Sequence, residues 1–185
     1  MTVRTASDGG SHTRPARRQY LGKHRGVVLQ NVDPMGIGRL QVQVIGVFTL
    51  ASSWAMPSFP VAGLQTGVVG IPPIGAGVWI EFEQGDPDSP IWTGCYYSTR
   101  AEVPPMIQLV APPIPAVTIQ TPLQNSIQVS DAPPSPVSGG IILRSTTHAG
   151  IVVNDSGVYI SDGKGGMITI VAGIVTINSG ALIVK

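Results

Sequence analysis

The chain has 185 residues, a length that accommodates one domain or two small ones with a substantial hydrophobic core. Charged residues make up 11% of the chain and hydrophobic residues 43%, which excludes the composition of a disordered protein. The net charge of +1 argues against nucleic acid as the main partner, because phosphate binding requires a concentrated basic surface. The 17 prolines and 23 glycines, with no stretch of helical apolar spacing, predict an all-β fold.

Cys95 is the only cysteine, so the chain forms no intrachain disulfide and no cysteine-based metal site. Because it lies beside Tyr96 in an expected strand, we predict that it is a small residue of the core. Residues 165–184 contain no charged side chain over a length close to that of a membrane-spanning helix. Their glycines and hydroxyl side chains make a poor membrane helix, so we predict no stable membrane insertion.

Basic side chains cluster near the start of the chain, against a single Asp8. This composition predicts a flexible basic arm over residues 1–20. The cluster consists of Arg4, Arg14, Arg17, Arg18, Lys23 and Arg25.

A hairpin is predicted over residues 73–97. Val78, Ile80 and Phe82 alternate with polar or amphipathic residues, which is the period of two of a strand with one buried face. Residues 85–88, Gly-Asp-Pro-Asp, have the composition of a tight turn, and a second strand is expected at residues 91–97.

Residues 38–45 form the clearest amphipathic strand, with Leu40, Val42 and Val44 on one face. Shorter strands are expected at residues 26–31, 53–56 and near 67–70. About five short strands in about 75 residues predict a small closed barrel of the OB type over residues 21–100.

Frequent prolines exclude a central strand from residues 101–137 and predict an extended neck, interrupted by strand-like pieces at 117–119 and 127–131. A loose repeat occupies residues 138–185. Each unit is a short strand that ends in a polar pair and a glycine, as in Val152-Val153-Asn154-Asp155-Ser156-Gly157. Such units cannot bury an apolar face alone and must stack on one another or on other chains.

About 48 residues are too few for a single-chain solenoid with its own core, whereas intertwined identical chains close their apolar faces on each other. We therefore predict an obligate homotrimeric β-helix or β-prism over residues 138–185, with an alternative start near Val117. The number three does not follow from the repeat. The predicted trimer core consists of Val153, Val158, Ile160, Ile168, Ile170, Val175 and Ile177.

Three motifs together resemble the OB domain of contractile-injection spike proteins, which include the phage baseplate assembly protein V family and the valine-glycine repeat (VgrG) proteins. They are Gly38-Arg39-Leu40-Gln41-Val42-Gln43-Val44, Pro73-Ile74-Gly75-Ala76-Gly77-Val78-Trp79-Ile80-Glu81-Phe82-Glu83 and Gly85-Asp86-Pro87-Asp88-Ser89-Pro90-Ile91-Trp92-Thr93-Gly94. The resemblance covers about residues 22–97, and residues 138–185 resemble the triple-stranded β-helix of the same proteins.

The resemblance implies a structural, non-enzymatic spike that sits under a baseplate hub protein and pierces a target envelope when the sheath contracts. It also implies assembly in the bacterial cytoplasm as part of a phage tail or tail-like particle, some of which are released extracellularly. The sequence lacks the His-x-His iron motif of some such spikes. A separate tip protein of the PAAR-repeat kind is instead expected to dock on Ala181, Leu182, Ile183, Val184 and Lys185.

Several side chains invite a chemical interpretation. Glu81 and Glu83 share a strand face, as an acid–base pair would. They face water, and the sequence places no third group beside them, so we predict no catalytic residue and no enzymatic activity. Turn roles, instead of metal or cofactor binding, are predicted for Asp86, Asp88, Asp155, Asp162 and His148.

Trp54, Trp79 and Trp92 are the residue type on which OB domains stack single-stranded nucleic acid. The acidic hairpin around residues 81–88 would repel a phosphate backbone, so we expect these rings to pack between barrels or against the hub. Two alternatives to the spike remain open from the sequence: an OB-fold single-stranded nucleic-acid-binding protein, and a trimeric fibre or adhesin.

Overall fold

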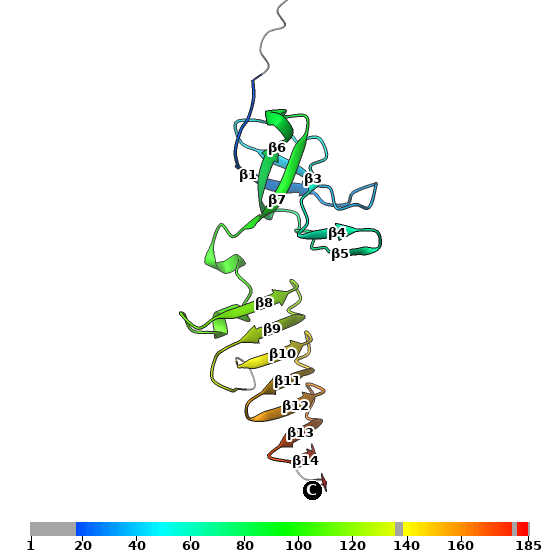
Figure 1. The fold of residues 1–185 in the computed structure, drawn as a ribbon, viewed down its shortest axis with the longest axis vertical. Coiled ribbons are helices and arrows are strands. Elements are labelled where there is room, and N and C mark those ends of the chain that lie inside the picture. Colours follow the sequence, from blue (N-terminus) through cyan, green and yellow to red (C-terminus); the bar gives the residue numbers. More distant parts are fainter. Residues whose placement is uncertain (1–17, 136–138, 179–180, 185) are drawn as a thin grey trace, which may run out of the picture. The chain divides into compact units, whose positions relative to one another are not determined.

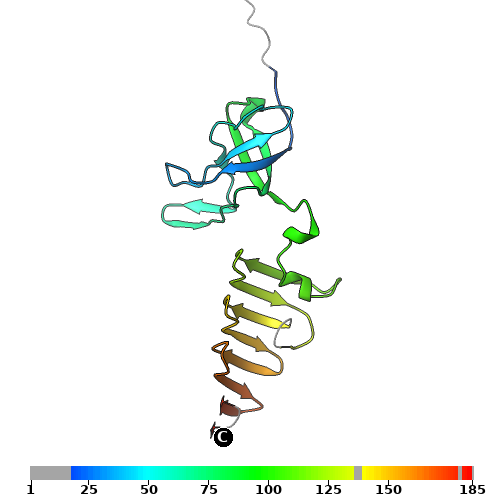
Figure 2. The same cartoon turned by 180° about the vertical axis from the view of Figure 1, so that it is seen from behind.

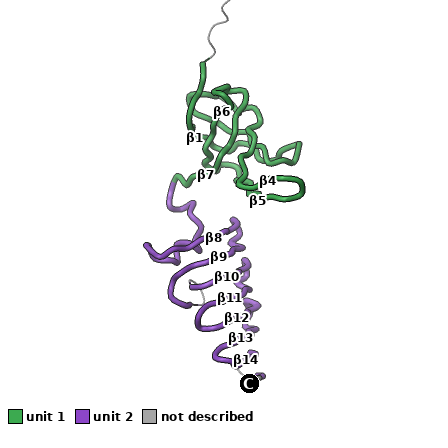
Figure 3. Tube along the Cα trace, in the orientation of Figure 1, with its two compact units in different colours: residues 1–98 green, residues 99–185 purple. Residues whose placement is uncertain are grey.

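The structure is a computed structural model that describes residues 18–135, 139–178 and 181–184. In these residues the regular structure consists of β-strands and three short 3-10 segments, which confirms the all-β fold class. The chain divides into two compact units, Met1–Ser98 and Thr99–Lys185, shown in green and purple in Figure 3. Most of the basic arm predicted over residues 1–20 lies outside the described residues.

The first unit is a small barrel whose five-stranded sheet has the order β2-β1-β6-β7-β3 (Figure 1). Its pairs are antiparallel, except that β3 and β7 are parallel. Leu40 and Ala55 bridge the two outer strands, since the amide of each donates to the carbonyl of the other, at 3.1 and 2.7 Å. The sheet therefore closes on itself, as in an OB barrel. The strands are β1 (His24–Gln30), β2 (Gln41–Val44), β3 (Met56–Pro57), β6 (Gly77–Phe82) and β7 (Pro90–Tyr96).

The core of the barrel is lined by the inner face of these strands. On β6 the buried Val78, Ile80 and Phe82 alternate with the half-buried Trp79 and Glu81, which confirms the alternation that the sequence predicts. The core cluster consists of Val28, Leu40, Val42, Val44, Ala55, Val78, Ile80, Phe82 and Trp92.

The turn between β6 and β7 also lies where the sequence predicts it. A 3-10 segment, Glu83–Gly85, begins the turn, and Gln84 and Gly85 adopt left-handed φ angles of 52° and 78°. Asp86 accepts a hydrogen bond at Oδ1 from the amide of Asp88, at 3.0 Å. Asp86 is therefore a turn-forming aspartate, as predicted.

A second, smaller hairpin projects from the barrel between β3 and β6. β4 (Val61–Gly63) pairs with β5 (Thr66–Val68), and all six strand residues are exposed. β5 overlaps the strand expected near residues 67–70, whereas its partner β4 was not predicted.

Cys95 is exposed, so the prediction that it belongs to the core was wrong. It pairs with the buried Val78 but lies next to the last residue of β7. The alternation of residues shows which face of a strand points inward. It does not show which residues near the end of the strand are still covered by the rest of the barrel.

The second unit is built on an eight-stranded antiparallel sheet in which consecutive strands are neighbours. β8 and β9 coincide with the two strand-like pieces, so the sheet begins inside the expected neck, close to the alternative start at Val117. Among the described residues no helix is long and apolar enough to cross a membrane. The strands are β8 (Ala116–Gln120), β9 (Ser126–Ser130), β10 (Gly140–Arg144), β11 (Gly150–Asn154), β12 (Gly157–Ser161), β13 (Met167–Val171), β14 (Ile174–Ile177) and β15 (Leu182–Val184).

The proline-rich segment before β8 is folded instead of extended. It contains two 3-10 segments, Arg100–Glu102 and Ile107–Leu109. Met106 is buried and its Sδ accepts a hydrogen bond from Ser126 Oγ on β9, at 2.9 Å. No strand forms in residues 101–115, but the prediction that prolines exclude a central strand from residues 101–137 was wrong, because β9 pairs with both β8 and β10. Met106, between the prolines, packs on the start of the sheet.

Asp33 organises the turn that follows β1. Its carboxylate accepts hydrogen bonds from the amides of Met35 and Ile37, both at 3.0 Å, and of Arg39, at 3.2 Å. The Arg39 guanidinium lies 2.7 Å from Oδ1. The side-chain hydrogen bond from Arg39, together with these amides, holds the pKa of Asp33 well below its ordinary range.

Replacing Asp33 with Asn should lower the stability of the barrel, because the amide loses the charge that Arg39 pairs with. A group whose pKa is lowered on folding stabilises the fold above its unfolded pKa, which is about 4 for aspartate, and loses this contribution as the pH falls through the folded pKa. The stability difference between the wild type and Asp33→Asn should therefore be constant from pH 5 to 7 and shrink below about pH 4. Urea unfolding at several pH values measures it. Glu83→Gln, at an exposed position in the 3-10 segment after β6, is the matched control, and an equal loss there would contradict the assignment.

Candidate trimer interface

One face of the eight-stranded sheet carries two apolar columns that run across the strands. Directly paired residues of antiparallel strands lie on the same face, so the register defines each column. The first column consists of Val117, Val129, Ile141, Val153, Val158, Ile170 and Val175. The second consists of Ile119, Ile127, Leu143, Ile151, Ile160, Ile168, Ile177 and Leu182. We call this surface the apolar face.

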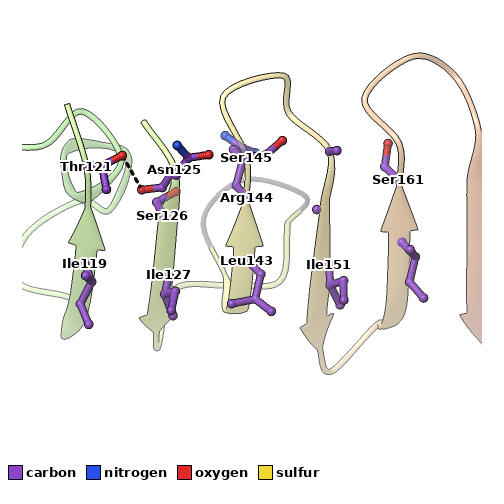
Figure 4. Close-up of a pocket in the computed structure, with 13 residues that line it drawn as sticks. Ile119, Thr121, Asn125, Ser126, Ile127, Leu143, Arg144, Ser145, Ile151 and Ser161 are labelled. Atoms are coloured by element: carbon purple, nitrogen blue, oxygen red, sulfur yellow. Dashed lines mark hydrogen bonds between the residues drawn. The ribbon is translucent and has the colours of Figure 1, made fainter. Parts of the chain in front are cut away.

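The apolar face is open in the single chain. Most of its side chains are between 38% and 68% exposed, and Val158, Val175 and Ile177 are half-buried. The second column lines a shallow groove of about 660 Å³, where Figure 4 shows Ile119, Ile127, Leu143 and Ile151 in a row on successive strands. A monomeric protein rarely exposes a contiguous apolar patch larger than a few hundred Å², so this face is expected to be covered by a partner.

The opposite face of the sheet is more polar and is better covered within the chain. On this face, Gln128 of β9 and Ile142 of β10 are almost fully buried. Thr118 Oγ1 donates a hydrogen bond to Gln128 Oε1, at 3.0 Å, so the amide is paired across β8 and β9. The contrast between the two faces identifies the apolar face as the candidate interface.

The turns explain why the sequence repeats a polar residue and a glycine after each strand. Asn154 Oδ1 accepts hydrogen bonds from the amide and the hydroxyl of Ser156, at 3.0 and 2.6 Å, and closes the tight β11–β12 turn. Gly157 follows with a φ of 148°, and a Cβ there would collide with the carbonyl oxygen of Ile170. Asp162 plays the same part at the β12–β13 turn, because its Oδ1 accepts from the amides of Lys164 and Gly166, at 2.7 and 2.9 Å.

Two family models match the chain. Residues 24–97 match the type VI secretion system/phage-baseplate injector OB domain, and residues 116–183 match the phage baseplate V C-terminal trimerisation domain. The chain belongs to the phage baseplate V family. No curated protein matches it.

Membership of the baseplate V family confirms the resemblance that the motifs indicate. The chain is a component of a baseplate spike, and the family is a structural one. The match to a trimerisation domain supports a homotrimer associated with a baseplate, and hence with a phage or secretion particle. The apolar face lies entirely within the residues that match this domain.

All seven residues predicted as the trimer core lie on the apolar face. The sequence prediction did not include the other residues of the apolar face, although β8 to β11 show the same alternation of apolar residues. Of the predicted tip-docking residues, Leu182, Ile183 and Val184 form β15 at the edge of the sheet, where Leu182 pairs with Ile177 and is exposed. The side chains of Ile183 and Val184, and the whole of Lys185, lie outside the described residues.

The residues considered as catalytic or metal-binding candidates lie outside the apolar face. Glu81 forms an ion pair with Lys23 at 2.8 Å, and Glu83 lies in the 3-10 segment after β6, so the two do not share a strand face. His148 lies in the β10–β11 turn with a left-handed φ of 64°. Within the described residues, no group of three or more His, Cys, Asp or Glu side chains is arranged to hold a metal ion.

The three tryptophans occupy different environments. Trp92 belongs to the barrel core, and its Nε1 donates to the carbonyl of Gly38, at 3.0 Å. Trp79 lies under the Arg25 guanidinium, and Trp54 lies under that of Arg39, at 5.5 and 5.3 Å from the ring centres. All three rings therefore contact groups of the chain itself, and their packing between barrels or against the hub stays a prediction.

Replacing Gly157 with Ala should destabilise the second unit by about 1–3 kcal/mol, because the added methyl group meets the Ile170 carbonyl at a φ that other residues rarely adopt. Denaturant unfolding followed by far-UV circular dichroism measures the loss. Gly70→Ala is the control, since its Cβ would meet no atom within 4 Å and its φ is not in the left-handed region. Equal effects of the two changes would show that the tight β11–β12 turn is not a constraint.

Proposed function

We propose that three copies of this chain form the central spike of a contractile injection machine, which pierces a target envelope when the sheath contracts. The observation that carries the proposal is the apolar face, because its two columns continue without a break from β8 to β14. A spike of this kind transmits force, so its role is mechanical and not catalytic.

In the proposed trimer, the apolar faces of three chains turn toward a common axis and cover one another. The proposed core includes Val153, Val158, Ile160, Ile168, Ile170, Val175 and Ile177, together with the remaining residues of the two columns. Fully burying such a side chain is worth about 1.5–3 kcal/mol, so each half-exposed one contributes on the order of 1 kcal/mol on assembly. A strand that opens would expose apolar surface of all three chains at once, which makes local opening under load costly.

The proposed parts follow the chain. Residues 1–20 are the basic arm, and residues 21–100 form the collar that meets a baseplate hub protein. We shorten the proposed neck, because the sheet begins at Ala116, and assign the needle to the strands from β8 onward instead of to residues 138–185 alone.

We further propose that a PAAR-repeat tip protein docks on residues 181–185. β15 is the terminal strand of the sheet in the described residues, so one side of its backbone has no described partner strand. Unpaired strand edges are surfaces to which another chain adds. The exposed Leu182 supplies an apolar contact beside that edge.

Replacing Ile168 with Asp should convert the trimer into monomers at concentrations where the wild type is fully trimeric. Three carboxylates would be moved into the apolar axis, at a cost of several kcal/mol for each unpaired charge. Light scattering on the purified full chain measures the mass. Thr169→Asp, on the same strand but the opposite face, is the matched control and should leave the trimer intact. A wild-type chain that is monomeric would refute the spike. If Thr169→Asp dissociates the trimer and Ile168→Asp does not, the trimer interface lies on the opposite face of the sheet.

Deleting residues 181–185 should abolish binding of the PAAR-repeat protein from the same particle and leave the trimer intact. The deletion removes the docking edge but retains both apolar columns as far as Val175 and Ile177. Co-sedimentation of the two purified proteins measures binding, and light scattering confirms the trimer. Deleting Lys185 alone is the control. Unchanged binding after the five-residue deletion would place the tip contact elsewhere.

A further inference from the structure

The barrel presents a second apolar surface that the spike mechanism does not use. It is formed by the β1–β2 loop and the β4–β5 hairpin, which project on the same side of the barrel in Figures 1 and 2. Their bases are connected, since the Asn31 side chain donates to the Pro72 carbonyl at 3.0 Å. We call this the two-hairpin surface. Its exposed residues are Val32, Met35, Ile37, Val61, Leu64, Val68 and Val69.

The two-hairpin surface is poor in charge. The sequence has no charged residue between Arg39 and Glu81, a stretch that includes the whole β4–β5 hairpin. The charges in the other loop neutralise each other, because Asp33 pairs with Arg39 and its side chain is only 3% exposed. Depletion of charge with large exposed apolar side chains is typical of the centre of permanent interfaces.

The β4–β5 hairpin needs a partner for its own stability. It is a two-stranded sheet in which every strand residue is exposed, and Leu64 in its turn is 96% exposed. A two-stranded hairpin without a covered face is at best marginally stable in water. Cover by another surface would supply the missing apolar burial.

The trimerisation domain indicates what that other surface is. This step rests on the proposed trimer. Only 19 residues separate β7 from β8, and part of this connection is already folded against the second unit through Met106. Three barrels tethered so closely reach an effective concentration of about millimolar, at which even a weak apolar contact forms.

We propose that the two-hairpin surfaces of the three chains pack against one another around the three-fold axis of the trimer. The partner of this surface is thus a second copy of the same chain. Identical apolar loops that meet at a rotation axis form a closed contact, which leaves no sticky surface for further growth. The contact orders the barrels as a ring and covers the β4–β5 hairpin.

Chemical cross-linking of the full chain tests this contact. In a Cys95→Ser background, Leu64→Cys is compared with Ile45→Cys, a control outside the two-hairpin surface that is 89% exposed. A short bifunctional maleimide should join Leu64→Cys chains at least tenfold faster than Ile45→Cys chains, and one pair per trimer limits the product to about two thirds of the chains. Light scattering first establishes that both variants are trimeric.

The outcomes separate this contact from the trimer itself. A monomeric wild-type chain overturns the spike and this inference together. Trimeric variants that cross-link at equal rates overturn the inference alone. In that case, amide exchange of residues 61–68 in the free trimer and in the assembled particle identifies the alternative: protection found only in the particle assigns the surface to another baseplate protein.

Discussion

The structure depends on an apolar sheet face that the single chain leaves uncovered. Antiparallel pairing places each valine, isoleucine or leucine of one strand beside that of the next, so the columns are a direct product of register. The opposite face buries Gln128 and Ile142 within the chain, but no described segment does the same for the apolar face. In the proposed trimer, burial of that face between copies couples the stability of the second unit to its assembly.

The barrel depends on a different feature, which is the closing of its five-stranded sheet. The reciprocal hydrogen bonds between Leu40 and Ala55 remove the open edges of a five-stranded sheet, and Trp92 fills the interior. Single-stranded nucleic acid binds OB domains through exposed aromatic platforms in basic grooves. Here the Arg25 guanidinium lies over the Trp79 ring and the Arg39 guanidinium lies over the Trp54 ring, as cation–π contacts. The barrel thus matches the injector OB domain of its family without an open aromatic platform among the three tryptophans.

Sequence patterns succeeded where a physical period is strong and failed where the outcome depends on distant packing. The alternation of Val78, Ile80 and Phe82 and the turn at Asp86 were readable because they are local. The exposure of Cys95, the folding of the proline-rich segment through Met106 and the pairing of β4 with β5 were not. Each depends on which surface lies nearby, and proline content or strand period carries no information about that surface.

The sequence by itself determined the all-β class, the OB barrel, the family and the need of the repeats for partner chains, because these follow from periodicity, turn chemistry and motif. It also placed seven core candidates on what proved to be one face. Only the tertiary structure decided that this face extends back to β8, since a column exists only once the register of neighbouring strands is known. The same holds for the two-hairpin surface, which brings together loops about thirty residues apart that only the closed barrel places on one side.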